Sequence, residues 1–404
     1  MTSKIKQRIE QIRRGNVPEG YKKTKAGILP VDWDVHMLGD CLSRVEKPVE
    51  VKPNALYTQI GIRSHGKGLF HKEPVTGAAL GNKAAFWIEP DCFIVNIVFA
   101  WEQAIGKTTQ FEVGMIGSHR FPMYRPVNDR VDIDYLISYF LTKRGTDILE
   151  AASPGGAGRN KTLGQARFLK SKIILPPIKE QRKIAAILTT QDKVIELKEK
   201  RLVKKQRQKK YLMQQLLTGK KRLPGFTFEV EETNIKAIST YSVSTIAQAT
   251  LERYEGKRLY PIFNADSIAG YVDFFENEHP YISIIKDGAG IGRVRLCEAK
   301  SSTIGTMGCI HACKGISIAF LYYLLGQVDF SKYSNGSTIP HLYYKDYSCE
   351  KVRVPDIQEQ TAIAEVLSAA DREIDLLRQD IEQEKQKKKA LMQLLLAGIV
   401  RVNV

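Results

Sequence analysis

The stretch PPIKEQRKIAAIL, Pro176–Leu188, returns near the other end of the chain as PDIQEQTAIAEVL, Pro355–Leu367. The two copies align without a gap at an offset of about 179 residues. The likeness continues from KKYLMQQLLTGKKR (Lys209–Arg222) to KKALMQLLLAGIVR (Lys388–Arg401). About 19 of roughly 47 aligned positions are identical, so the chain carries a true internal duplication that sets its domain plan.

Each copy predicts one long helix. In the second copy, apolar residues recur at alternating steps of four and three, which is the seam of a coiled coil: Ile363, Leu367, Ala370, Ile374, Leu377, Ile381, Leu391 and Leu395. Glu384 and Lys388 form a polar patch on that seam. A proline precedes each copy, and Gly219 and Gly398 suit helix ends. Some 34 helical residues would span roughly 50 Å, and an apolar stripe of that length needs a partner.

The charges indicate that the two helices pair with each other in antiparallel fashion. This pairing places one basic run opposite one acidic zone: Lys198, Lys200, Arg201, Lys204, Lys205 and Arg207 against Asp371, Glu373, Asp375 and Asp380. Parallel pairing would instead set Asp192 beside Asp371 and put lysines beside lysines. Opposite charges flanking a seam favour the antiparallel arrangement, although each exposed pair contributes little.

The sequence before each copy is rich in Gly, Tyr and Phe and contains short β-type runs such as AAFWIEP, CFIVNIVFAW, YISIIKDG and GRVRLCE. These two segments do not align convincingly with each other. We therefore predict an α+β protein in which two globular domains are separated by two long helices forming an antiparallel coiled coil, as a pseudo-twofold internal repeat. Its parts are an N-terminal helix and extension (1–34), a first domain (35–175), a central repeat helix (176–222), a second domain (223–354) and a C-terminal repeat helix (355–404).

The charge of the chain points to a polyanionic partner. The formal net charge is +17, with a sequence pI near 9.4, and much of the excess lies between Arg182 and Arg222. The first residues contain no apolar signal core, and the longest apolar runs are too short for a membrane span, so a cytoplasmic protein is expected. The six cysteines do not suggest a disulfide framework, and Cys309-Ile-His-Ala-Cys313 lacks a second pair of zinc ligands.

Sequence signatures of catalysis are incomplete. The stretch from Gly155 to Thr162 has the Lys-Thr of a nucleotide-binding loop but Asn160 in place of its second glycine. Asp287 with Glu298 and Lys300 has a loose nuclease-like spacing, but such spacing is common by chance, and a β-hairpin surface explains it better. No catalytic residue and no metal site is expected. Two alternatives stay open: a DNA nuclease or methyltransferase with fused recognition domains, and a coiled-coil protein that binds DNA without sequence preference.

The paired P-x-I-x-E-Q-x-x-I-A helices, each ending in L-M-Q-x-L-L-x-G, resemble those of the specificity subunit of a type I restriction–modification enzyme. LPVDWDVHMLGDCLS (Leu29–Ser43) is similar to the family's entry into its first target-recognition domain, and NGSTIPHLYYKDYSCEKVRVP (Asn335–Pro355) to the exit from its second. The first exit loop departs from the pattern, with Gly-Gly-Ala-Gly-Arg-Asn in place of a Thr-Ile-Pro type.

The resemblance implies that each domain recognises one half of a bipartite, asymmetric double-stranded DNA target. It also implies that the helices set the spacing and dock two adenine-methyltransferase (modification) subunits and, through them, restriction (translocase/nuclease) subunits. The chain itself would be non-catalytic and hold no cofactor. The complex would use S-adenosylmethionine, with ATP and magnesium for restriction, and no membrane partner is expected.

Exposed polar side chains in Gly-rich loops are the candidates for DNA contact, because such groups reach base edges and phosphates. They are Lys107, Arg120, Arg159, Asn160 and Lys161 in the first domain, and Lys286, Arg293, Asn335, Thr338, His341 and Tyr343 in the second. For partner docking we expect Glu180, Gln181, Glu359 and Gln360 with the adjoining helix surfaces. A role in capping the first helical turn is the alternative for these four. The N-terminal segment faintly echoes the sequence after the central helix, and we expect it to lie near the C-terminus.

Overall fold

The computed structural model describes residues 3–25, 27–81, 84–155, 161–227, 229–288, 290–336 and 338–403. The chain divides into two compact units. Unit 1 comprises Met1–Leu197 with Ile381–Val404, and unit 2 comprises Lys198–Asp380. Each unit therefore contains one globular domain together with part of each long helix, so the units cut across the linear order of the segments.

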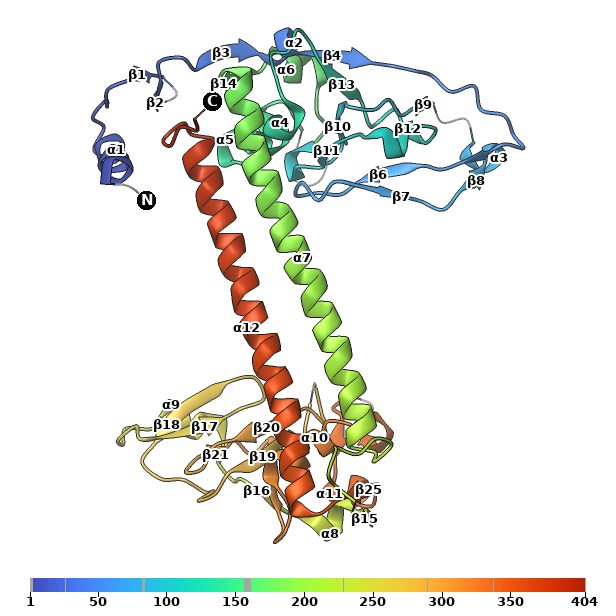
Figure 1. Ribbon diagram of the computed structural model, residues 1–404, viewed down its shortest axis with the longest axis vertical. Coiled ribbons are helices and arrows are strands. Elements are labelled where there is room, and N and C mark those ends of the chain that lie inside the picture. The colour runs from blue at the N-terminus through green and yellow to red at the C-terminus, as the bar shows by residue number, and fades with distance from the viewer. Residues whose placement is uncertain are drawn as a thin grey trace. The chain divides into compact units, whose positions relative to one another are not determined.

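The two repeated segments each form one continuous helix, α7 (Ile178–Leu216) and α12 (Ile357–Leu395), of 39 residues each (Figure 1). At the start of α12 the Asp356 carboxylate accepts the backbone N–H groups of Gln358 and Glu359 at 2.9 and 3.1 Å, which satisfies two donors left open at a helix start. The glycines Gly219 and Gly398 follow the helices with φ of +67° and +69°. The predicted helix ends are confirmed, and the helices are somewhat longer than expected.

The antiparallel pairing is confirmed in both units. In unit 2, Lys198 Nζ lies 2.8 Å from Asp380 Oδ1 and Lys205 Nζ lies 2.8 Å from Glu373 Oε2. In unit 1, the polar patch of the seam is satisfied because Gln191 donates to Glu384 Oε2 at 2.6 Å. The cores agree with this direction: Ile184 shares a cluster with Leu395, and Ile363 shares one with Leu216.

The domain of unit 1 is a mixed α/β body built around a four-stranded antiparallel sheet in the order β4-β13-β10-β11. Its core elements are β3 (Asp34–Met37), α2 (Leu38–Cys41), β4 (Leu42–Val45), β10 (Phe93–Val95), β11 (Ile105–Lys107), β13 (Met123–Pro126), α4 (Ile133–Phe140), α5 (Lys143–Ala151), α6 (Gln165–Lys170) and β14 (Lys172–Leu175). The core rings of Phe93 and Phe168 stack with centroids 6.1 Å apart. β14 pairs with β3 and leads directly into α7.

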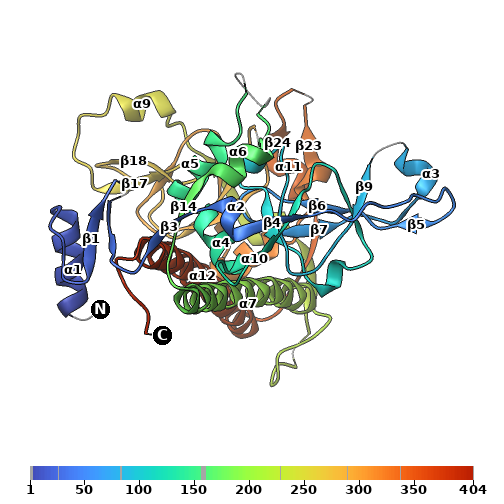
Figure 2. The ribbon, with the colours of Figure 1, turned by 90° about the horizontal axis from the view of Figure 1, so that it is seen from above.

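Smaller elements extend this domain away from α7 (Figures 1 and 2). They are β5 (Leu56–Tyr57), β6 (Ile60–Ile62), β7 (Leu69–His71), β8 (Val75–Thr76), α3 (Gly77–Leu80), β9 (Ala85–Trp87), η1 (Ala100–Glu102), η2 (Gln110–Glu112) and β12 (Ile116–Ser118). The strands among them form two-stranded pairs, β5 with β8, β6 with β7 and β9 with β12. Of the predicted run CFIVNIVFAW, only its first part is a strand, and its end is the short helix η1.

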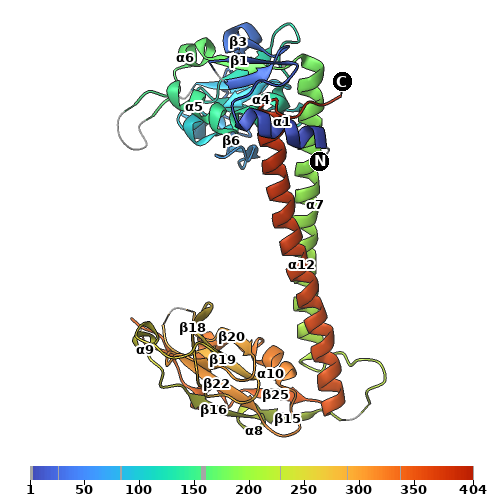
Figure 3. The same ribbon diagram turned by 90° about the vertical axis from the view of Figure 1, so that its left-hand side faces the viewer.

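The domain of unit 2 has a four-stranded antiparallel sheet in the order β16-β22-β19-β20, with α10 packed on it (Figure 3). Its elements are β15 (Glu231–Asn234), α8 (Ile235–Ile238), β16 (Ser239–Val243), α9 (Gln248–Glu252), β17 (Tyr260–Phe263), β18 (Ile268–Val272), β19 (Tyr281–Ile285), β20 (Val294–Cys297), β21 (Ser302–Thr303), β22 (Met307–Ala312), α10 (Ile318–Leu325), η3 (Phe330–Tyr333), β23 (Ser334–Asn335), β24 (His341–Leu342), α11 (Tyr344–Tyr347) and β25 (Lys351–Val354). β25 pairs with β15 and leads into α12.

The two domains share one topology although their sequences do not align. The chain order β3, α2, β4, β10, β11, β13, α4, α6, β14 in unit 1 corresponds to β15, α8, β16, β19, β20, β22, α10, α11, β25 in unit 2. The sheet orders β4-β13-β10-β11 and β16-β22-β19-β20 match strand for strand, and every neighbouring pair is antiparallel in both. The repeat therefore includes the domain cores as well as the helices.

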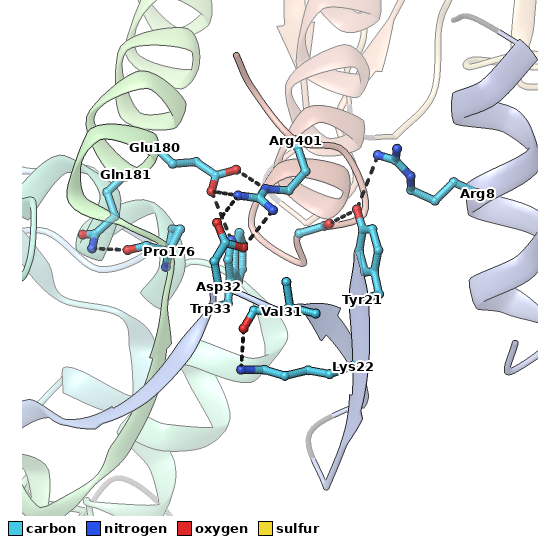
Figure 4. Close-up of polar contacts among 11 residues, drawn as sticks. Arg8, Tyr21, Lys22, Val31, Asp32, Trp33, Pro176, Glu180, Gln181 and Arg401 are labelled. Atoms are coloured by element: carbon cyan, nitrogen blue, oxygen red, sulfur yellow. Dashed lines mark hydrogen bonds and ion pairs between the residues drawn. The ribbon is translucent and has the colours of Figure 1, made fainter. Parts of the chain in front are cut away.

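The N-terminal segment lies against the end of α12 within unit 1, as its sequence echo predicted. It consists of α1 (Ser3–Arg13) and a hairpin of β1 (Tyr21–Thr24) and β2 (Gly27–Pro30), which lies in the part predicted as an extension after the helix. The Tyr21 hydroxyl donates to the backbone carbonyl oxygen of Gly398 at 2.8 Å (Figure 4). In the described part of the chain, no helix combines the length and the apolar character needed to cross a membrane.

Candidate functional site

The start of α7 is tied to the end of the chain by a buried carboxylate (Figure 4). Glu180 is fully buried, and the Arg401 guanidinium donates to its two oxygens at 2.7 and 2.8 Å. Arg401 also reaches both oxygens of Asp32 at 2.9 and 2.7 Å, and the Trp33 indole N–H donates to Glu180 at 3.1 Å. Bidentate guanidinium–carboxylate geometry of this kind is among the stronger polar contacts in proteins.

These contacts shift the pKa values of Asp32 and Arg401. Burial raises the pKa of Asp32, but the hydrogen bonds and the charge of Arg401 lower it by a larger amount, so the pKa is below its ordinary value. The hydrogen bonds to Glu180 raise the pKa of Arg401 well above its ordinary value. Asp32 and Arg401 therefore remain charged at neutral pH.

The same tie recurs at the start of α12 in unit 2. The Arg222 guanidinium donates from Nε to the two oxygens of Glu359 at 2.8 and 2.9 Å, and from Nη2 at 2.5 Å. Arg222 and Arg401 occupy equivalent places in the repeat, as do Glu180 and Glu359. Each long helix thus begins against the tail of the other, held by an arginine that stands three residues after the glycine of the helix end.

The neighbouring glutamines fasten each helix to its own domain. The Gln181 side chain donates to the carbonyl oxygens of Pro176 and Arg130, and its oxygen accepts the backbone N–H of Asp132 at 2.9 Å. Gln360 makes the corresponding set with Pro355, Gly315 and the backbone N–H of Ser317 at 2.8 Å. Asp132 and Ser317 are the N-cap residues of α4 and α10, so each glutamine couples a long helix to the first core helix of its domain.

The structure corrects the prediction that these four side chains contact a docking partner. Glu180, Gln181, Glu359 and Gln360 are at most 1% exposed, and their polar atoms are bound to groups of this chain. They are not simple caps of the first turn either, because they connect helices to domains and to each other. The prediction that the adjoining exposed helix surfaces dock a partner stays a prediction.

Three of the candidate DNA contacts in unit 2 gather at one place. The β19–β20 hairpin carries Lys286 and Asp287 just after β19, and β24 brings His341 beside them. His341 Nδ1 lies 2.7 Å from Asp287 Oδ1, and Lys286 Nζ contacts the other carboxylate oxygen. Burial raises the pKa of Asp287, but its bonds to Lys286 and His341 outweigh this effect and lower the pKa. Exposed Tyr343 stacks beside His341, with ring centroids 6.4 Å apart.

The remaining candidates of unit 2 lie on nearby loop segments. Arg293 lies in the turn of the same hairpin, just before β20; its side chain is 58% exposed and pairs with Asp266 at 3.2 Å. Asn335 on β23 donates to Asp346 at 3.2 Å, and Thr338 is exposed. Their contact with bases or phosphates stays a prediction.

The candidates in unit 1 are more dispersed. Lys107 at the end of β11 pairs with Asp134 at 2.9 Å. Burial lowers the pKa of Lys107, but this contact reverses the effect and raises it overall. Arg120 is exposed in the turn after β12, and Lys161 lies over the Trp101 ring with its Nζ 5.2 Å from the centroid. Arg159 and Asn160 lie outside the described residues. That these residues contact DNA also stays a prediction.

The structure argues against a nuclease-like magnesium site formed by Asp287, Glu298 and Lys300. Tyr281 pairs with Cys297 and Ile284 with Val294, so Asp287 lies beyond the turn end of this hairpin while Glu298 and Lys300 lie beyond its open end. Four residues of strand between them span roughly 13 Å, too far for one magnesium ion to bridge. Among the described residues, no group of three or more Asp, Glu, His or Cys could hold a metal ion.

Sequence reasoning missed the roles of Arg222, Arg401 and Asp287. The two arginines did leave a signal, because they are among the identical positions of the repeat and no helical periodicity required them. No sequence signal indicated the role of Asp287, since its partner His341 is distant in the chain.

Known proteins show the same organisation. A type I restriction enzyme specificity subunit of Methanocaldococcus jannaschii, MjaVIII, is 23% identical over 95% of this chain and 97% of its own length. The crystal structure of a type I restriction–modification S subunit from M. genitalium matches with a TM-score of 0.58 at 15% identity, over 90% of this chain and 96% of that one. A further structure, from a study of complex assembly and conformational transition in the type I system, matches with a TM-score of 0.57 at 16% identity, over 92% of this chain and 99% of that one.

At these sequence identities the two structures show a common fold and nothing more. The family model for the type I restriction modification DNA specificity domain, however, matches residues 88–206 and 225–386, well over half of the chain. Each match takes in part of one globular domain and part of the long helix that follows it. The chain therefore belongs to the type I restriction–modification DNA specificity family.

Proposed function

We propose that this chain is the DNA-recognition subunit of a type I restriction–modification complex, with each globular domain recognising one half of a bipartite target. The observation that carries this proposal is the repetition of a single domain topology, fastened twice to a coiled coil by equivalent arginine–glutamate and glutamine ties. The loops outside the common core differ between the domains, so each presents different side chains. A repeated scaffold with two different surfaces suits an asymmetric target in two parts.

In this proposal the chain does no chemistry. Two modification subunits flip and methylate one adenine in each half-site with S-adenosylmethionine, and restriction subunits add ATP- and magnesium-dependent cleavage. A flipped base must enter the pocket of a catalytic subunit, so the specificity chain has to hold duplex and partner together. The work takes place in the cytoplasm, where chromosomal and incoming DNA meet the complex.

The long helices would set the distance between the half-sites. A helix rises about 1.5 Å per residue, so one added turn in both helices lengthens the spacer by about 5.4 Å, somewhat under two base pairs of rise. We expect such an insertion to change the gap of the methylated motif without changing either half.

The direct test is single-molecule sequencing for methyladenine in cells that express this chain with its modification subunit, beside cells that lack this chain. A split asymmetric motif that appears only with the chain supports the proposal. Exchange of residues 36–175 for the equivalent domain of a relative should then alter one half of the motif. A change in both halves, or no motif in spite of complex formation, would contradict it.

The alternative of a nonspecific coiled-coil DNA binder is weakened by one observation. Lys198, Lys205 and Lys209 of the basic run are engaged with acidic residues of α12. The nonspecific model predicts a steep salt dependence and no sequence preference, whereas specific recognition predicts discrimination between target and random duplex at one salt concentration.

A further inference from the structure

Each unit has a groove at the same place in its domain. In unit 1, a groove of about 700 Å³ lies between the end of α4, α5 and β14, and it is lined by Tyr139, Ile148, Lys172 and Ile174 among others. In unit 2, a groove of about 430 Å³ lies between the end of α10 and β25, and its lining includes Leu324, Lys351, Val352 and Arg353. Both grooves lie beside the strand that leads into a long helix.

The internal repeat relates four lining positions of the two grooves. Ser171, Lys172 and Ile174 of the first correspond to Glu350, Lys351 and Arg353 of the second at the offset of the duplicated helices. Tyr139 and Leu324 also correspond, because each stands seven residues after the N-cap of its core helix. The grooves are therefore two copies of one feature and not two chance hollows.

Both grooves combine an apolar floor with a basic rim. The first has Ile148, Ala151 and Val35 in its lining, and Val35 is 57% exposed although it is aliphatic. In the second, Leu217 and Leu324 are buried core residues at 3% and 4% exposure, and Val328 is half-buried. The exposed Val35 at the first groove is the kind of aliphatic side chain that an assembly covers.

Three basic residues stand at each groove: Lys25, Arg144 and Lys172 at the first, and Lys220, Lys351 and Arg353 at the second. Each groove also has one acidic residue. Asp147 pairs with Lys143 at 3.4 Å, and Glu350 accepts a hydrogen bond from the Tyr333 hydroxyl. Glu232 lies within 4.0 Å of both Lys351 and Arg353, at the edge of the second groove. The balance at each rim stays basic, which suits an occupant with acidic groups beside an apolar face.

We propose that the two grooves are equivalent docking sites, each taking one copy of the same acidic, apolar-faced segment of a modification subunit. The inference rests on the proposed function, which requires two identical partners. Two repeat-related surfaces at equivalent places, each with a basic rim, bind two copies of one partner, as symmetry-related interfaces do. Duplex DNA fits less well, since its charged backbone would leave the aliphatic side chains of the first groove uncovered, among them the exposed Val35.

The test uses matched charge reversals in the full chain, Lys172→Glu in the first groove and Lys351→Glu in the second. Both side chains are exposed, so folding should be unaffected, which circular dichroism checks. Native mass spectrometry and titration with purified modification subunit then measure stoichiometry and affinity. Lys52→Glu and Lys236→Glu, exposed lysines that line neither groove, are the controls.

We expect the wild-type chain and both controls to bind two modification subunits. Each single reversal should weaken one of the two binding steps at least tenfold, and the double variant should weaken both. Zero-length carbodiimide coupling should join Lys172 and Lys351 to the same acidic peptide of the modification subunit. Loss at one groove only, or coupling to two unrelated peptides, would overturn the inference of equivalence.

The failure of this inference can be told apart from failure of the proposed function. If the reversals leave two partners bound at unchanged affinity while the methylated motif persists, the docking inference is wrong and the proposed function stands. If the reversals lower affinity for target DNA and not for the modification subunit, the grooves face DNA and the inference is equally overturned. If the wild-type chain neither binds the modification subunit nor directs a motif, the proposed function itself is wrong.

Discussion

Replacing Arg401 with leucine should destabilise unit 1 strongly, because it leaves the Glu180 carboxylate buried without its cation. Glu180 is 1% exposed at the side chain and Arg401 is 30% exposed. Breaking a buried ion pair by removing one partner typically costs about 3–5 kcal/mol, whereas the more exposed contact with Asp32 adds less than about 1 kcal/mol. Since Arg401 is partly open to solvent, we expect about 3 kcal/mol in the free energy of unfolding.

Tryptophan emission reports this loss selectively. Trp33, Trp87 and Trp101 are the three tryptophans of the chain, and all of them lie in unit 1. With a urea dependence of about 2 kcal/mol per molar, a loss of about 3 kcal/mol lowers the emission midpoint by about 1.5 M. Arg182→Leu is the matched control, because Arg182 makes an exposed pair with Asp129 in the same unit and should cost about 0.5 kcal/mol or less.

A double-mutant cycle identifies the cause. Glu180→Gln keeps an acceptor for the Trp33 indole but removes the charge, so it should recover part of the stability lost in the Arg401→Leu background. We expect a coupling of at least about 1 kcal/mol between the two sites. If Arg401→Leu shifts the midpoint no more than Arg182→Leu does, or if the two changes are additive, the contact between Arg401 and Glu180 does not hold the start of α7.

Three further outcomes follow from the contacts. Gly398→Ala should destabilise more than the repeat-related Gly219→Ala. Both positions have positive φ, costing about 1 kcal/mol, but a Cβ at Gly398 would stand 2.7 Å from the Pro30 ring, whereas one at Gly219 would make only an ordinary contact with Arg353 at 3.8 Å. Equal losses of protection at the two helix ends in hydrogen exchange would contradict this. Asp287→Ala should alter or weaken only the second half of the methylated motif, because it releases His341 from its 2.7 Å contact; an unchanged motif and rate in methyladenine sequencing would contradict this. The pKa of Asp32 is lowered in the folded protein, so its contribution to stability is full at pH 7, above the unfolded pKa of about 3.9. This contribution is lost as the pH falls through the folded pKa. Urea unfolding midpoints of Asp32→Asn and wild type should therefore differ at pH 7 and converge below about pH 4.

The helices could be predicted in detail because the patterns that indicate them are local in sequence and occur in both copies of the repeat. The seam repeats every three and four residues, the glycines stand where each helix ends, and the charges opposite one another settle the pairing direction. The observed contacts Lys198–Asp380 and Lys205–Glu373 are of the kind that those charges required. The position of the N-terminal segment could also be anticipated, since it echoes the sequence that follows the other helix.

The buried ties could not be predicted because their roles depend on what surrounds them. Glu180 and Gln181 look like surface residues of a first helical turn, where polar side chains are usually solvated. Only the folded chain brings Arg401 and Trp33 to Glu180, across more than 140 residues in each direction. In the same way, Asp287 gains its partner His341 only when β24 is brought to the β19–β20 hairpin.

The sequence by itself determined the duplicated coiled coil, its direction, and the existence of two α+β domains, because periodic apolar spacing and complementary charge act between near neighbours or along one seam. Only the tertiary structure revealed that the two domains are the same fold and that their helix starts are locked by equivalent buried ties. Many apolar sequences fill one sheet-and-helix core equally well, so the domain cores can share a topology without sharing residues that align. The equivalence survives in strand order and in a few polar contacts, and these exist only once the chain has folded.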